Sequence, residues 1–120
     1  MIKYCCLSLT ILLSLCAFSQ KDIKLEEIKD HVGDSVKICG KIFTARYFAN
    51  AQDAPTLLNM GDAYPNQKIT IVIYGNRRKE FADSPETHYL NKEICVTGKI
   101  SIYKEKPQIV IYSKDQIVSN

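Results

Sequence analysis

The sequence predicts a mostly β protein, a five-stranded barrel with an N-terminal lead-in helix and a short helix between strands 3 and 4. Short runs alternate apolar and polar residues, as in Ile69, Ile71 and Ile73, which is the period of a half-buried strand. Gly40 and Gly98 stand inside the two longest runs, where a barrel strand often bends or bulges. The runs follow one another as three strands, a helical connection and two strands.

The elements are predicted one by one from local patterns. A loose apolar stripe followed by Gly33 predicts a helix over residues 20–35. Helical potential around residues 77–82 should be interrupted at Ser84-Pro85, and Lys104 to Pro107 should form the last hairpin turn. A short closing segment is expected at residues 113–118. The strands are expected at residues 36–48, 56–60, 68–74, 93–103 and 108–112.

Residues 1–19 have the pattern of a signal peptide. Lys3 precedes an apolar run over residues 7–15, and Ala17-Phe18-Ser19 places small residues at a cleavage site before Gln20. The run is about half of the ~20 residues that a spanning helix needs. We therefore expect an exported, periplasmic or secreted protein, with residues 20–120 as its single domain and no membrane span in the mature chain. A retained anchor is the alternative, and a lipoprotein is disfavoured because Leu15 precedes Cys16.

Composition restricts the partners only loosely. Removal of residues 1–19 takes away Lys3 and no carboxylate, so the net charge falls from +3 to +2. This balance does not compel a nucleic-acid or membrane partner, and any attraction to polyanions must come from local clusters of charge. A chain of this length holds one domain rather than two.

Several stretches carry a resemblance to a known fold family. They are Thr56 to Gly61, Tyr64-Pro65-Asn66-Gln67, Ile69 to Gly75, Val96 to Ile100, and Tyr103 with Lys106 to Ile109. Together they resemble small exported bacterial domains of the oligonucleotide/oligosaccharide-binding (OB) fold, which occur alone or beside secreted nucleases. The resemblance covers residues 25–118 and implies a binding module. It does not identify the ligand, because this fold hosts many activities.

The candidate ligand-binding residues are basic and aromatic side chains near strand ends and on the third strand. In the OB fold, the second and third strands and the first and last hairpin loops border the ligand groove, where aromatic rings can stack on bases and cations can follow phosphates. The candidates are Arg46, Tyr47, Lys68, Tyr74, Arg77, Arg78, Tyr103, Lys104 and Lys106.

Other interpretations of these residues remain open. Surface lysines and tyrosines packed on barrel ends would have the same pattern, and the run Asn76 to Lys79 favours a solvated helix start. The loop Tyr64-Pro65-Asn66 favours a turn over a binding surface. The partner is therefore expected to be single-stranded nucleic acid or an oligosaccharide, and the alternative is an envelope protein or an ion held by a structural domain.

The sequence gives little support for catalysis or for a bound metal. His31 and His88 are 57 positions apart, and neither lies in a recognisable motif. No metal-ligand spacing accompanies Cys39 or Cys95, and no loop has the spacing of a calcium site. We therefore expect a protein that is not an enzyme and that carries no cofactor and no metal.

Cys39 and Cys95 are the two cysteines that remain after residue 19. In this fold the first and fourth strands are antiparallel neighbours, and alternation places Ile38 and Val96 inward, so that both cysteines point outward. Outward residues opposite each other on such strands lie close enough for a bridge after small adjustment. We therefore predict a Cys39–Cys95 disulfide, which an oxidising compartment would favour. The alternative is two separate buried thiols.

Overall fold

The computed structural model describes residues 20–120, so the predicted signal peptide lies outside the described residues. Seven strands form one continuous sheet. They are β1 (Lys21–Ile23), β2 (Ser35–Tyr47), β3 (Thr56–Met60), β4 (Ile69–Ile73), β5 (Glu93–Tyr103), β6 (Lys106–Ile111) and β7 (Ile117–Ser119). The helical segments are the 3-10 helices η3 (Leu25–His31), η4 (Gly75–Glu80) and η5 (Lys114–Gln116) and the α-helix α2 (Pro85–His88).

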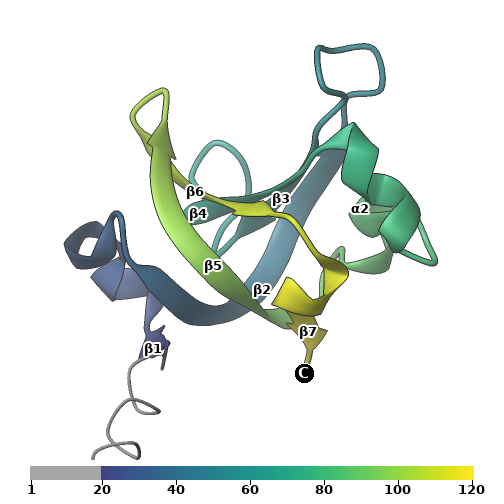
Figure 1. The fold of residues 1–120 in the computed structure, drawn as a ribbon. Helices are drawn as coiled ribbons and strands as arrows, with labels where there is room; N and C mark the ends of the chain where they lie inside the picture. The colour runs from purple at the N-terminus through teal and green to yellow at the C-terminus, as the bar shows by residue number, and fades with distance from the viewer. Residues whose placement is uncertain (1–19) are drawn as a thin grey trace, which may run out of the picture.

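Five of the strands close into a barrel (Figure 1). Neighbours run in the order β2, β3, β4, β6, β5, and β5 pairs again with β2. All these pairs are antiparallel except β4 with β6, which is parallel. β1 and β7 extend the sheet beside β2 and β5. Strand number, order and the helical connection agree with the OB fold predicted from the sequence.

The barrel is filled mainly by isoleucines. Each strand sends every second side chain inward, so Ile69, Ile71 and Ile73 of β4 are fully buried as predicted. Ile109 and Ile111 of β6 meet them from the parallel neighbour. Burial of this apolar surface is the main force that closes the sheet.

The two strand glycines are required by close approach. A Cβ atom on Gly98 would lie 2.5 Å from Cγ2 of Ile109, and one on Gly40 would lie 2.8 Å from Cγ of Met60. The actual register shift of β2 falls between Ile42 and Thr44, after Gly40. The glycines therefore leave room for core side chains, and the bulge is a separate feature that the sequence pattern did not locate.

The lead-in helix is shorter than predicted. β1 occupies Lys21–Ile23 in parallel pairing with β2, and only Leu25–His31 is helical, as a 3-10 helix. The backbone amide of Lys24 donates to Oε1 of Glu27 at 2.7 Å, which ties the first turn of the helix. Ile23 and Ile28 are buried in the barrel core as the apolar stripe indicated, but Val32 is exposed.

Two turns also differ from the sequence-based boundaries. Pro85 lies in the first turn of α2 and begins this helix, where a proline is well tolerated, rather than interrupting one. The last hairpin turn consists of Lys104 and Glu105 alone, with φ of 50° and 68°. Two such residues match the twist of the flanking strands, so β6 begins at Lys106, earlier than predicted.

The predicted disulfide is present. Cys39 and Cys95 are direct partners in the β2–β5 ladder, and their Cα atoms lie 4.0 Å apart. The bridge is on the outer surface of the barrel, because Ile38 and Val96 beside the cysteines point inward and are fully buried. Within residues 20–120, no helix has the length and apolar character needed to cross a membrane.

Candidate ligand-binding groove

A groove of about 740 Å³ crosses the outer face of β3, β4 and β6. Its floor includes Leu57, Thr70 and Val72, which face outward because their neighbours along each strand fill the barrel. Val72 is only 3% exposed, because it lies between Leu57 and Val110 in the register of the sheet and beneath the loops around it. The floor is therefore apolar at its centre.

Two loops form the walls of the groove. The β2–β3 loop contributes Phe48, Gln52, Asp53 and Pro55, and the β5–β6 hairpin contributes Tyr103 and Lys104. These loops rise on either side of β3 and β4 (Figure 1). This is the location that the OB fold uses for oligomeric ligands.

The β2–β3 wall is held in place by backbone contacts. The amide of Phe48 donates to the carbonyl of Pro55 at 2.9 Å, and the amide of Gly75 donates to the carbonyl of Asp53 at 2.8 Å. A Cβ on Gly75 would lie 2.9 Å from Cβ of Ala54, so a side chain there would push the loop away. The wall is consequently held both by hydrogen bonds within the loop and by its contact with Gly75 at the start of η4.

Four aromatic rings line the groove: Phe48, Tyr64, Tyr74 and Tyr103. Tyr64 and Tyr103 are 68% and 58% exposed, which leaves much of each ring surface available to a ligand. The amide groups of Gln52, Gln67 and Gln108 also line it. Rings beside amides can combine stacking with hydrogen bonding.

The positive charge around the groove is modest. Lys104 and Lys106 line it together with one carboxylate, Asp53. The ammonium of Lys106 donates to the carbonyl of Pro65 at 3.1 Å, which links the hairpin to the β3–β4 loop. Arg46 lies on the outer face opposite Leu57, and its guanidinium is 4.8 Å from the centre of the Phe48 ring.

The structure brings only some of the predicted residues together. Tyr74, Tyr103, Lys104 and Lys106 line the groove, and Arg46 flanks it through Phe48. The remaining predicted residues do not line it. They are Tyr47, Lys68, Arg77 and Arg78.

Arg78 belongs to an intramolecular cluster. Its guanidinium stacks 3.6 Å from the centre of the Tyr47 ring and donates to Oε1 of Glu86 at 2.8 Å and to Oγ1 of Thr56 at 2.6 Å. Partial burial acts to raise the pKa of Glu86, but hydrogen bonds from Arg78 and the backbone, with the charge of Arg78, outweigh it and hold this pKa below its ordinary value. Nearby, Arg77 pairs with Glu80 at 3.4 Å. This arrangement favours the structural interpretation of the basic run.

Several groove residues were not among the sequence candidates: Phe48, Leu57, Tyr64, Gln67 and Gln108. Most of them lie in the stretches that carry the resemblance to OB domains, from Thr56 to Gly61, Tyr64 to Gln67 and Lys106 to Ile109. That convergence was the signal that could have found them. Tyr64-Pro65 adopts a turn with a cis peptide bond, as the turn interpretation predicted, and it also contributes Tyr64 to the groove.

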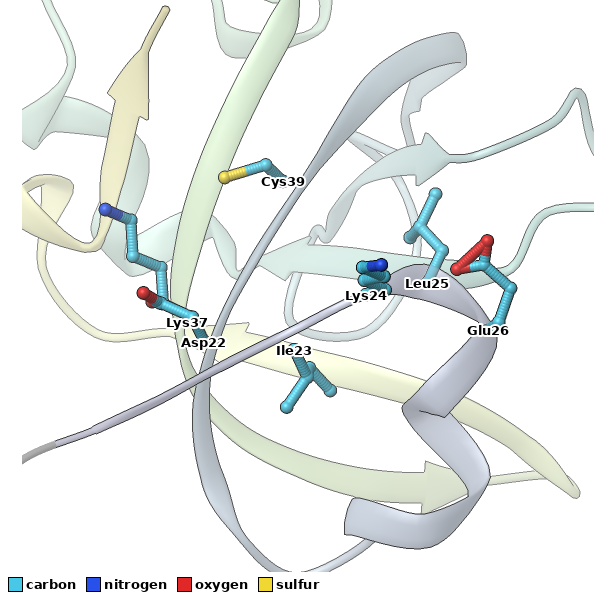
Figure 2. A pocket seen from close by; sticks show the side chains of 7 residues that line it. All are labelled: Asp22, Ile23, Lys24, Leu25, Glu26, Lys37 and Cys39. Carbon is cyan, nitrogen blue, oxygen red and sulfur yellow. The ribbon is translucent and has the colours of Figure 1, made fainter.

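A second depression of about 500 Å³ lies beside β1, and Figure 2 shows its lining. Side chains from β1, the start of η3 and β2 surround it, and the sulfur of Cys39 points toward β5 (Figure 2). Its charges are of both signs, from Asp22, Lys24, Glu26 and Lys37. No predicted ligand-binding residue lies there.

Within residues 20–120, no three His, Cys, Asp or Glu side chains gather where they could hold a metal ion. No protein-family model and no curated protein matches this sequence. Among solved structures, the chain is similar to a "putative aspartyl-tRNA synthetase from Leishmania major Friedlin", with a TM-score of 0.52 and 11% sequence identity over 84% of this chain. The likeness is one of fold. The match covers 21% of the synthetase chain, so this chain corresponds to about a fifth of that protein.

Proposed function

We propose that this protein is an exported OB-fold binding module that holds single-stranded nucleic acid in the groove over β3, β4 and β6, without an enzymatic step. The observation that carries the proposal is the set of four aromatic rings that line the groove, with Tyr64 and Tyr103 well exposed. Base–aromatic stacking tolerates any sequence and contributes about 1–3 kcal/mol per base.

Charge supports a nucleic acid over a neutral chain. Arg46, Lys104 and Lys106 lie in or beside the groove, against the single carboxylate of Asp53. At the level of fold, the similar solved chain is named for tRNA. Export is supported by the signal-like residues 1–19 and by the Cys39–Cys95 disulfide, since disulfides persist mainly in oxidising compartments.

The proposal predicts a defined loss when a stacking ring is removed. Tyr103→Ala should weaken binding of a labelled single strand by about 1–3 kcal/mol, measured by fluorescence anisotropy at low salt. Tyr112→Ala is the matched control, because Tyr112 is 64% exposed but does not line the groove. Equal affinities for the two variants would contradict stacking at Tyr103.

Salt dependence separates a nucleic acid from an oligosaccharide. Two or three phosphate contacts on a single strand predict that affinity falls by about 7- to 18-fold between 50 and 200 mM salt. Binding of a neutral oligosaccharide should hardly change over this range. If neither DNA, RNA nor glycans bind at low salt, the proposal fails and the alternative of a protein-interaction domain of the cell envelope stands ahead.

A further inference from the structure

One end of the groove contains a row of polar side chains that crosses three strands. Nδ2 of Asn59 donates to Oγ1 of Thr44 at 3.0 Å, and Oγ1 of Thr70 donates to Oδ1 of Asn59 at 3.1 Å. Nε2 of Gln67 then donates to Oγ1 of Thr70 at 3.0 Å. Asn59 is only 5% exposed, and a buried network of this kind holds its members in one arrangement.

Gln108 continues this row on the next strand. It is the backbone partner of Thr70 in the parallel β4–β6 ladder, and it lines the groove. Within residues 20–120, the side-chain amide of Gln108 makes no hydrogen bond, in contrast to those of Asn59 and Gln67. Its two amide donors and its carbonyl acceptor are therefore available to a ligand.

Tyr64 stands at the same end of the groove, on a loop fixed from two sides. The amide of Tyr64 donates to Oγ1 of Thr44 at 3.1 Å, the same hydroxyl that anchors the polar row. The ammonium of Lys106 donates to the carbonyl of Pro65 at 3.1 Å. The backbone that carries the exposed ring is thus tied to β2, through Thr44 of the polar row, and to β6, the strand that carries Gln108.

We propose that Tyr64 and Gln108 form a base-reading position, in which a nucleobase stacks on the tyrosine ring while its edge is hydrogen-bonded by the glutamine amide. This inference rests on the proposed function and adds sequence preference to it. Stacking alone hardly distinguishes bases, whereas a glutamine amide, which carries donors on its nitrogen and an acceptor on its oxygen, matches some donor and acceptor patterns better than others. The polar row places the hydrogen-bonded side chain of Thr70 next to Gln108 in the sheet.

The experiment compares four labelled single-stranded homopolymers of equal length, oligo(dA), oligo(dC), oligo(dG) and oligo(dT), by anisotropy at low salt. We expect the wild-type protein to prefer its best homopolymer over its worst by about 5- to 100-fold, the range that one amide–base pair provides. Gln108→Ala should bring the four affinities within about 2-fold of one another. Gln108→Glu should raise the ratio of oligo(dC) to oligo(dT) affinity, because a carboxylate accepts from the cytosine amino group and opposes the thymine carbonyls.

Lys104→Ala is the control, because an ammonium meets the phosphates that all four strands share rather than a base edge, and Lys104 lines the same groove from the β5–β6 hairpin. It should change the four affinities by a common factor and keep the wild-type preference. Ratios between homopolymers do not depend on the fraction of folded variant, so loss of stability cannot imitate the result. Equal wild-type affinities, or a preference that survives in Gln108→Ala, would overturn base reading and leave the proposed function standing. Absence of binding by every strand would overturn both.

Discussion

The Cys39–Cys95 disulfide should supply a large part of the stability of this domain. It joins β2 to β5, the strand pair whose contact closes the barrel, and it spans 56 positions. Cross-linking a loop of this length lowers the entropy of the unfolded chain, which corresponds to about 4 kcal/mol of stability at 25 °C. Domains of this size have a free energy of unfolding of about 5–15 kcal/mol, so its loss should lower Tm by about 15–30 °C.

The test replaces both cysteines by alanine. Alanine is preferred to serine because Cys95 is 7% exposed, and a serine hydroxyl there would need a buried partner. Urea unfolding is followed for the oxidised wild type, for the wild type with dithiothreitol and for the double variant. The reduced wild type and the double variant should have free energies of unfolding within about 1 kcal/mol of each other and about 4 kcal/mol below that of the oxidised wild type. Both should keep the fold, because the backbone ladder between β2 and β5 remains.

The single variant Cys39→Ala distinguishes the cross-link from packing. This variant removes the bridge as fully as the double variant does, so it should lower the free energy of unfolding by the same amount. If it lowers that free energy by only about half as much, the loss comes from two independent side-chain contacts. A difference below about 1 kcal/mol between oxidised and reduced wild type, or two free thiols in the unreduced protein by mass spectrometry, would refute the reasoning.

Three further outcomes are expected. Gly98→Ala should destabilise the barrel by about 1–3 kcal/mol in urea unfolding, because the new Cβ would lie 2.5 Å from Cγ2 of Ile109; Ile109→Leu, which removes that methyl, should recover part of the loss. The pKa of Glu86 is lowered in the folded state from an ordinary value of 4.5, so its contribution to stability is present above about pH 4.5 and is lost as the pH falls through the lowered pKa. In Glu86→Gln and in Arg78→Met, this part of the decrease in the free energy of unfolding at acidic pH should be absent. N-terminal sequencing of exported protein should begin near Gln20, and a start at Met1 would contradict cleavage.

Strand positions and inward faces could be predicted well from local pattern. The alternation of Ile69, Ile71 and Ile73 along β4 indicates which face of this strand is buried without knowledge of its neighbours. The same alternation on β2 and β5 predicted that Cys39 and Cys95 both face outward, and the strand order implied by the resemblance to OB domains predicted that they meet. These predictions succeeded because a strand with one buried face is specified by its own residues.

The bulge in β2 decides on which face of the strand Tyr47 lies. Extending the alternation of Val36, Ile38 and Ile42 along the strand places Tyr47 outward. The register shift between Ile42 and Thr44 reverses the faces, so that Tyr47 pairs with the buried Thr56 and lies away from the groove. No local signal marked the extra residue, because it is accommodated by pairing with β3.

The basic run at the start of η4 could not be interpreted from the sequence for a different reason. Arg78 finds Tyr47 and Thr56 from strands far away along the chain, together with Glu86 from α2. The sequence alone does not show which partners a run of basic residues will find, because those partners come from distant parts of the chain. Lys104, by contrast, lies at the tip of the β5–β6 hairpin and lines the groove.

The β class, the order of strands, the buried isoleucine faces and the cysteine pair could be predicted from the residues, because each depends on periodicity or on the strand order that the OB resemblance implies. Which residues line the groove together could not, because that depends on contacts between distant segments. Tyr64, Thr70, Gln108 and Tyr103 come from three strands and one connection. They meet because β4 and β6 pair in parallel across 38 positions of sequence, as in the Thr70–Gln108 pair. Such long-range pairing is set by closure of the barrel around its core, and no local pattern contains it.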